Sequence, residues 1–71
     1  MLEQLFGSRT RVKLLRLFLT NPTTAYYVRE LSRRIDEQLN SVRRELANLQ
    51  NLGVVQTDSQ GDKKFYQLNT R

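Results

Sequence analysis

An amphipathic helix followed directly by two short strands is the feature that most constrains how this chain folds. Apolar residues recur at intervals of three, four and three residues, which places them on one face of a helix over about residues 37–52. These residues are Leu39, Val42, Leu46 and Leu49. Gly53 follows where the end of a helix favours positive φ. The pattern predicts a helix with one face in a hydrophobic core and a strand immediately after it.

The opposite face of this helix carries small polar side chains around arginine. Its residues are Asn40, Ser41, Arg44 and Asn48, with Arg43 and Ala47 on one flank and Glu45 on the other. Small side chains permit close approach to a DNA major groove, where Arg can pair bidentately with guanine and Asn with adenine. The solvated face of an ordinary amphipathic helix explains the same pattern, so the helix alone leaves both interpretations open.

Residues from about 54 to 69 predict a β-hairpin. Val54-Val55 and Phe65–Leu68 have strand-forming composition, and Asp58–Asp62 between them has the Gly, Asp and Ser content of a turn. Because a two-stranded ribbon is not stable by itself in water, the hairpin must pack on the helices. The residues expected at that contact are Val54, Tyr66 and Leu68.

A first helix is predicted over about residues 8–20. Ser8 is suited to cap its N-terminus, and Asn21-Pro22 is a combination through which helices rarely continue. The helix is apolar around most of its circumference, which predicts that it is the central core helix. We expect its one polar face to be a solvated stripe rather than a DNA contact. The residues of that stripe are Arg9, Lys13 and Arg16.

A short strand at about residues 24–27 and a helix at about 28–35 follow. The expected buried side of this helix is Val28, Leu31 and Ile35, and the expected outward side is Arg29, Arg33 and Arg34. Glu30 lies in the first turn, where a carboxylate favours the helix dipole. The few residues around Asp36–Gln38 separate this helix from the next, as in a helix-turn-helix, and either Asp36 or Gln38 is expected to cap the next helix.

Composition limits the classes of protein to which this chain can belong. With 71 residues and 38% hydrophobic content, one domain with a small core is expected over residues 1–71. A net charge of +5 predicts a polyanionic partner, and without a long apolar run a membrane surface is a weaker candidate than nucleic acid. The chain has neither Cys nor His, so we expect no metal, no cofactor and no enzymatic activity. Surface salt bridges and capping account for its carboxylates Asp36, Glu37 and Glu45.

The order helix, strand, helix, helix, strand, strand resembles the winged helix-turn-helix of ArsR- or MarR-like prokaryotic transcriptional regulators over residues 5–69. The matching strings are Leu5–Arg11 (LFGSRTR), Tyr27–Arg33 (YVRELSR), Asn40–Leu46 (NSVRREL), Leu49–Val55 (LQNLGVV) and Lys64–Asn69 (KFYQLN). The resemblance implies an α+β fold, a three-helix bundle with a small antiparallel β-wing. One departure is Asp36–Gln38, where the family commonly has a Gly, an apolar residue and a Ser or Thr cap.

The resemblance implies roles for particular residues toward double-stranded DNA. The base-reading residues would be Asn40, Ser41, Arg43 and Arg44 on the recognition helix, with Gln38 and Asn48 secondary. The phosphate contacts would be Lys63 and Lys64 near the tip of the wing, Arg29, Arg33 and Arg34 on the preceding helix, and Thr24. The two lysines can also protect the edge of the hairpin against aggregation, and this interpretation is compatible with a phosphate contact.

The implied function is sequence-specific binding of double-stranded DNA by a cytoplasmic transcriptional regulator. The alternative is a winged helix that serves as a protein-interaction or assembly module of a larger protein. The resemblance also allows a homodimer, to which Leu2 could contribute, whereas Leu5 and Phe6 are expected to pack on the core beside the first helix. RNA binding is disfavoured because no aromatic-rich strand motif for stacking bases is present.

Overall fold

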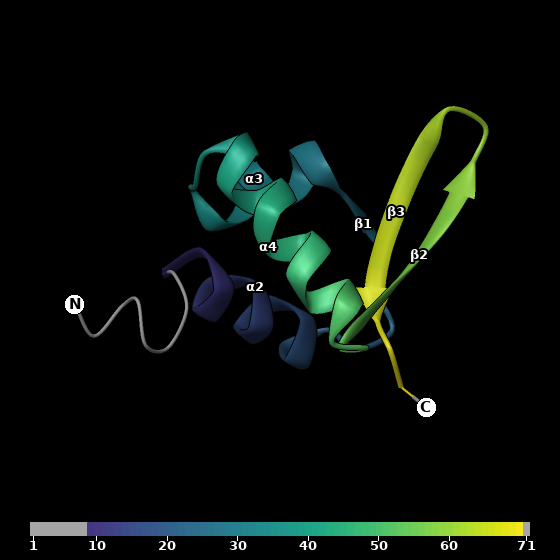
Figure 1. Cartoon of the computed structure of the whole chain (residues 1–71), viewed down its shortest axis with the longest axis horizontal. Coiled ribbons are helices and arrows are strands. Elements are labelled where there is room, and N and C mark those ends of the chain that lie inside the picture. Colours follow the sequence, from purple (N-terminus) through teal and green to yellow (C-terminus); the bar gives the residue numbers. More distant parts are fainter. Residues whose placement is uncertain (1–8, 71) are drawn as a thin grey trace.

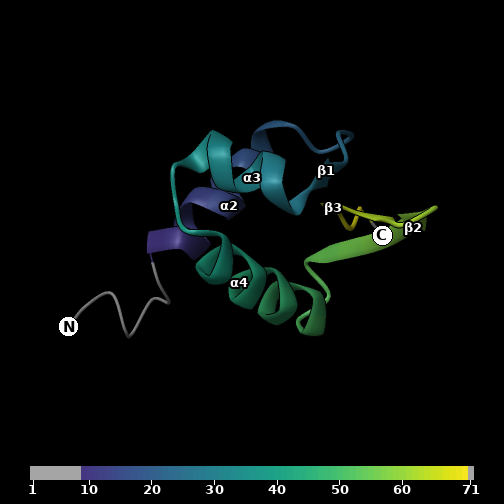
Figure 2. The same cartoon turned by 90° about the horizontal axis from the view of Figure 1, so that it is seen from above.

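Three helices and a three-stranded antiparallel sheet make up the structure, a computed structural model that describes residues 9–70 (Figure 1). The elements in chain order are α2 (Arg9–Thr20), β1 (Tyr26–Tyr27), α3 (Val28–Ile35), α4 (Leu39–Asn51), β2 (Val55–Gln60) and β3 (Lys63–Leu68). The helices pack together, while β2 and β3 project from them as a hairpin (Figure 1, Figure 2). The predicted α+β winged-helix class is therefore confirmed.

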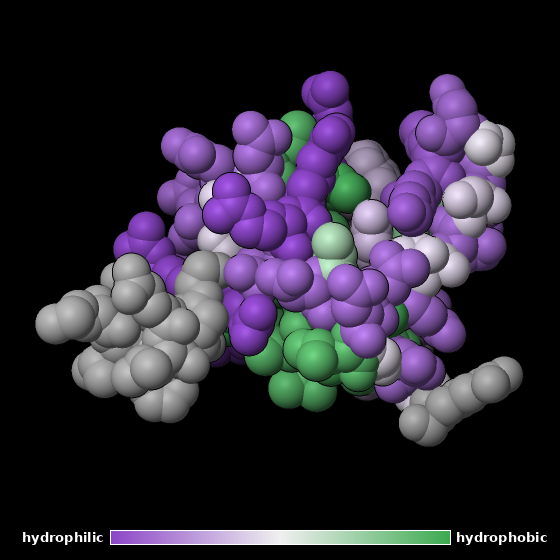
Figure 3. All heavy atoms as spheres, in the orientation of Figure 1, coloured by the Kyte–Doolittle hydropathy of each residue, from purple (hydrophilic) through white to green (hydrophobic). Residues whose placement is uncertain are grey.

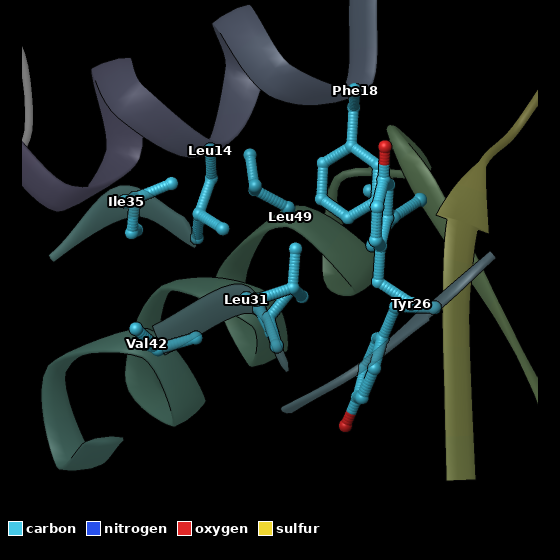
Figure 4. Close-up of a cluster of buried hydrophobic side chains, with 10 residues drawn as sticks. Leu14, Phe18, Tyr26, Leu31, Ile35, Val42 and Leu49 are labelled. Atoms are coloured by element: carbon cyan, nitrogen blue, oxygen red, sulfur yellow. The ribbon is translucent and has the colours of Figure 1, made fainter. Parts of the chain in front are cut away.

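The core lies where the three helices meet the base of the sheet. Its buried side chains are Leu14, Phe18, Tyr26, Leu31, Ile35, Val42, Leu46, Leu49, Val55 and Tyr66. Figure 4 shows Leu14 and Phe18 pointing from α2 into this cluster. The rings of Phe18 and Tyr26 meet edge to face with centroids 5.9 Å apart, which joins α2 to β1. Three residues of the predicted stripe on α4 are buried and the first, Leu39, is half-buried.

The α2 helix is buried on one face only, which corrects the prediction that it is the central core helix. Thr10, Leu14 and Phe18 are buried at intervals of four residues, whereas Val12 and Leu19 are 48% and 64% exposed. In a chain of this size no further element covers the opposite side of α2 within the described residues. The expectations for Ser8, and for Leu2, Leu5 and Phe6, lie outside the described residues.

The strand order is β1-β3-β2, and both pairings are antiparallel. Register pairs Tyr26 with Tyr66 and Val55 with Leu68, so these side chains lie on the face toward the helices. Val54, half-buried just before the strand, packs against the core as predicted, and Val55, 2% exposed, adds a buried contact that was not predicted.

The hairpin turn is shorter than predicted. Asp58, Ser59 and Gln60 belong to β2 and pair with β3, so the turn consists of Gly61 and Asp62 alone. Gly61 has φ of 65°, as a two-residue turn with glycine at its first position requires. The polar composition of residues 58–60 suggested a turn, although these residues form a strand. They are polar because the outer half of the hairpin extends beyond the core, where strand residues are exposed on each face.

The turn between α3 and α4 is closed by hydrogen bonds within the backbone and from one serine. Asp36 ends α3 in the left-handed conformation (φ 56°, ψ 54°), and its N–H donates to the carbonyl of Ser32. The hydroxyl of Ser32 donates to the carbonyl of Glu37 over 2.6 Å. Gln38 occupies the N-cap position of α4, but its side chain makes no capping hydrogen bond. Neither Asp36 nor Gln38 therefore caps α4 through its side chain, contrary to prediction.

We expect Asp36→Gly to raise the free energy of unfolding by about 0.5 to 1 kcal/mol, because glycine adopts positive φ without the steric cost that a Cβ imposes. Urea unfolding measures the change. Asp36→Ala is the matched control, since it also removes the carboxylate from the C-terminus of α3 but keeps the Cβ. Equal stabilities of the glycine and alanine variants would contradict the backbone explanation.

Candidate nucleic-acid interface

The α4 helix presents an exposed polar face because its apolar stripe is turned inward. Asn40, Arg43 and Arg44 are exposed on α4, and Ser41 and Asn48 are half-buried. Gln38 is exposed directly before the helix. The structure thus places all six predicted base-reading residues on α4 or at its start, with the exposed ones in its first half.

Two arginines of α3 border a hollow between the starts of α3 and α4. Arg29 and Arg33 are exposed and one helical turn apart. The hollow has a volume of about 410 Å³, and its lining is Tyr27, Arg29, Ser32, Arg33 and Leu39. Two guanidinium groups beside the start of a helix can hold phosphate oxygens, whereas the hydroxyl of Ser32 already donates to the carbonyl of Glu37.

Arg34, the third arginine predicted to bind phosphate, is separated from this pair. Its Nε lies 3.4 Å from a carboxylate oxygen of Glu30, and its guanidinium carbon lies 5.5 Å from the centre of the Tyr26 ring. Arg34 lines a groove with α2 rather than the hollow that Arg29 and Arg33 border. Thr24 is exposed in the loop between α2 and β1, where its N–H donates to the carbonyl of Asn21.

The two wing lysines are exposed on β3 immediately after the turn. Because they are consecutive in a strand, they leave opposite faces of the hairpin. Lys63 Nζ lies 5.4 Å from the centre of the Tyr27 ring, and Lys64 Nζ lies 5.7 Å from that of Tyr66. Each ammonium group is therefore steadied by an aromatic ring while it remains accessible to an anion.

Ion pairs divide the basic residues into two groups. Those paired with carboxylates are Arg9, Arg11, Lys13 and Arg34. Among the described residues, Arg29, Arg33, Arg43 and Arg44 form no ion pair and no hydrogen bond through their side chains. Hydrophilic side chains cover the surface over α3 and α4 in Figure 3, and an apolar area lies below them. The unpaired guanidinium groups thus belong to the two helices of the helix-turn-helix, with one further unpaired arginine, Arg16, on α2.

Sequence reasoning missed the role of Glu37, which joins α2 to the turn before α4. Its carboxylate accepts from Lys13 Nζ over 2.8 Å and lies 3.2 Å from Arg9 Nε. Lys13 Nζ also donates to the carbonyl of Ile35 over 2.9 Å. The hydrogen bond from Lys13 lowers the pKa of Glu37, and the positive charges of Lys13 and Arg9 act in the same direction. No sequence signal marks these contacts, because they join residues more than twenty positions apart.

We expect Glu37→Gln to destabilise the fold at neutral pH and to reduce its sensitivity to acid. Since the pKa in the folded state lies below the ordinary value of 4.5, the ionised carboxylate contributes its full stabilisation above that value. The contribution is lost as pH falls through the lowered pKa. Urea unfolding at several pH values between about 3 and 7 measures it. Parallel pH profiles for the wild type and Glu37→Gln would contradict the role of Glu37, and Asp58→Asn serves as the control for an exposed carboxylate.

Glu45 lies on the buried side of α4 rather than among the exposed residues where it was expected. It is 7% exposed, and its carboxylate accepts from Arg11 Nε over 2.8 Å. This contact fixes the position of α4 relative to α2. Glu37 thus ties α2 to the turn before α4, and Glu45 ties α2 to the middle of α4.

Residues 9–70 contain neither a cluster of metal ligands nor a membrane-spanning helix. No three carboxylate, thiol or imidazole side chains gather there in a way that could hold a metal ion. None of the helices in this range has the length and apolarity needed to cross a membrane.

The chain is similar to one solved protein, reduced HlyU from Vibrio cholerae N16961, with 28% sequence identity and a TM-score of 0.74. The match covers 97% of this chain and 70% of the HlyU chain. No protein-family model matches the sequence, and none of the curated proteins is a significant match. The similarity to HlyU together with three helices and an antiparallel β-wing identifies the fold as a winged helix.

Proposed function

We propose that the chain is a sequence-specific DNA-binding domain of a transcriptional regulator, related to the ArsR- or MarR-like regulators. The winged-helix fold and the similarity to HlyU support this proposal. In this proposal α4 enters the major groove of double-stranded DNA, and Asn40, Ser41, Arg43 and Arg44 read base edges. Gln38 and Asn48 border that contact. The protein acts by occupying a site on DNA rather than by chemistry.

The observation that carries the proposal is the distribution of unpaired arginines. Carboxylates neutralise three of the four basic residues of α2 and Arg34 of α3. Among the described residues they leave Arg29, Arg33, Arg43 and Arg44 without an ion pair, and on α2 Arg16 alone. Uncompensated guanidinium groups on the two helices of a helix-turn-helix favour a polyanion that lies across both helices. DNA has this charge density, and α4 has the small side chains that close approach requires.

The phosphate contacts extend from α3 to the wing. Arg29 and Arg33 would hold one backbone strand beside the start of α4, and Lys63 and Lys64 would hold another at the hairpin tip. Arg34, paired with Glu30, and Thr24 are weaker candidates for the same role.

Binding to a labelled duplex of about 25 base pairs across a salt series tests the proposal, with fluorescence anisotropy as the readout. Affinity should fall steeply with salt. Lys63→Ala and Lys64→Ala should each weaken binding to all sequences and reduce the salt slope by about 1. The control is Arg16→Ala, which removes the same charge from α2 and should leave the slope nearly unchanged. Salt-insensitive binding, or equal slopes for all four proteins, would reject the wing as a phosphate contact.

A protein-interaction module is the second candidate, and exposed apolar side chains favour it. Val12, Leu19 and Leu52 are 48%, 64% and 68% exposed. Figure 3 shows an apolar area on the lower part of the molecule, where α2 lies in Figure 1. A folded sample that fails to bind duplex DNA at low salt would place this candidate first.

A further inference from the structure

A groove between α2 and α3 lies apart from the face of α4 proposed to read DNA bases. Its volume is about 390 Å³, which is within the range of small-molecule sites. Among the described residues, its lining comes from α2, the residue after it and the end of α3, with none from α4 or the wing. The lining residues that matter here are Lys13, Arg16, Leu17, Thr20, Arg34 and Ile35.

The groove combines an apolar floor with a positively charged rim. Leu17 and Ile35 supply aliphatic surface, while Lys13, Arg16 and Arg34 supply cations from two helices. No carboxylate within residues 9–70 belongs to the lining. A bare inorganic anion would leave the aliphatic surface uncovered, and a neutral apolar molecule would leave Arg16 without a partner among the described residues. The lining therefore favours a ligand that has an apolar body and one anionic group.

The three cations differ in how far they are already engaged. Lys13 Nζ donates to the carbonyl of Ile35 and to Glu37, over 2.9 and 2.8 Å. Arg34 contacts Glu30 over 3.4 Å, which is long for a charge-assisted hydrogen bond. The side chain of Arg16 has no partner among the described residues. Arg16 is thus the group best able to bind an incoming carboxylate, with Arg34 and Lys13 adding positive potential.

We propose that this groove binds a small organic carboxylate with an aliphatic body. The carboxylate lies between Arg16 and Arg34, and the aliphatic chain covers Leu17 and Ile35. Thr20 is placed at the same rim, but its hydroxyl is already bonded to the carbonyl of Arg16, so it shapes the groove and does not bind the ligand. The groove shares Arg34, one of the weaker candidates for a phosphate contact, with the proposed DNA contact, whereas Arg16, Leu17 and Ile35 belong to the groove alone.

Octanoate is a suitable probe, with octanol and sulfate as matched probes for the aliphatic body and the charge. Amide chemical shifts of the isotope-labelled protein, recorded without DNA, report where each probe binds. We expect octanoate to shift the amides of Arg16, Leu17 and Ile35 saturably, with a dissociation constant on the order of 1 mM. Octanol and sulfate should bind at least about fivefold more weakly, since each lacks one of the two contacts.

Arg16→Gln should weaken octanoate binding about tenfold, and Arg16→Lys should retain most of it. Arg43→Gln is the matched control, because it removes an exposed, unpaired arginine from another helix and should leave octanoate binding unchanged. Equal losses of octanoate binding in the Arg16→Gln and Arg43→Gln proteins would mean that the effect comes from net charge alone, and would overturn the proposed site. Sulfate binding as tight as that of octanoate, or shifts confined to α4 and the wing, would overturn it as well. Because no DNA is present, the result does not depend on whether the chain binds DNA.

Discussion

Replacing Arg43 and Arg44 together by alanine is expected to reduce binding to a preferred DNA sequence by about 2 to 6 kcal/mol, since each bidentate contact to a base contributes about 1 to 3 kcal/mol of discrimination. The reduction corresponds to roughly thirtyfold to twenty-thousandfold in the dissociation constant. Both side chains are exposed and form no ion pair among the described residues. The loss should therefore come from the DNA contact and not from unfolding.

Selection of a preferred duplex from a random pool, followed by anisotropy with that duplex and with a random one, measures this loss. The double variant should lose more affinity for the preferred duplex than for the random one. The control is the Arg29→Ala/Arg33→Ala variant, which removes the same charge from α3 and should weaken both duplexes by similar factors. Equal losses on the two duplexes for Arg43→Ala/Arg44→Ala would refute base reading by α4. Circular dichroism establishes that each variant is folded.

The helical part of this fold is predictable from sequence because its contacts are periodic. Val42, Leu46 and Leu49 follow the helical repeat, and each is buried as that repeat requires. Gly53 has φ of 81° immediately after the last turn of α4, as its place in the sequence indicates. Local rules of spacing and backbone conformation are sufficient for these features.

The α2 helix shows where periodicity fails. Its apolar residues occupy most of the circumference, so sequence alone does not say which of them meet the other helices. The structure buries Leu14 and Phe18 and exposes Val12 and Leu19. Which residues of α2 are buried depends on where α3, α4 and β1 dock. That is a property of tertiary packing, and the sequence of α2 alone does not contain it.

The sequence predicted which arginines of α4 are exposed more successfully than it predicted the contacts that hold α4 in place. Arg43 and Arg44 are exposed on α4, as helical geometry predicts. The sequence did not indicate that Glu45, the next residue, is buried. The pairing of Arg34 with Glu30, by contrast, follows from their spacing of four residues on one helix. A charged residue is expected at the surface unless a distant partner compensates it, and the partner of Glu45 is 34 positions away in the sequence.

The contact between Arg11 and Glu45 is expected to be the most sensitive polar interaction in the domain. Arg11→Met should lower the free energy of unfolding by about 2 to 3 kcal/mol, because it removes the Arg11 guanidinium from the Glu45 side chain, which is only 9% exposed. The Arg11 side chain is 30% exposed, so water replaces part of the contact, and we expect less than the 3 to 5 kcal/mol of a fully buried pair. A domain of this size has a stability of about 4 to 11 kcal/mol, so the loss is a substantial fraction of the total.

A double-mutant cycle measures the interaction energy between Arg11 and Glu45 separately from the contacts that each makes with its other neighbours. Arg11→Met/Glu45→Leu should recover most of the stability that Arg11→Met loses, because two apolar side chains can fill the space between α2 and α4 without an unpaired charge. Urea unfolding of the four proteins gives the coupling energy. Additive losses would mean that the two side chains act separately. If the pair fixes α4 relative to α2, Arg11→Met should also weaken DNA binding under conditions in which the variant remains folded, although Arg11 is not part of the proposed DNA contact.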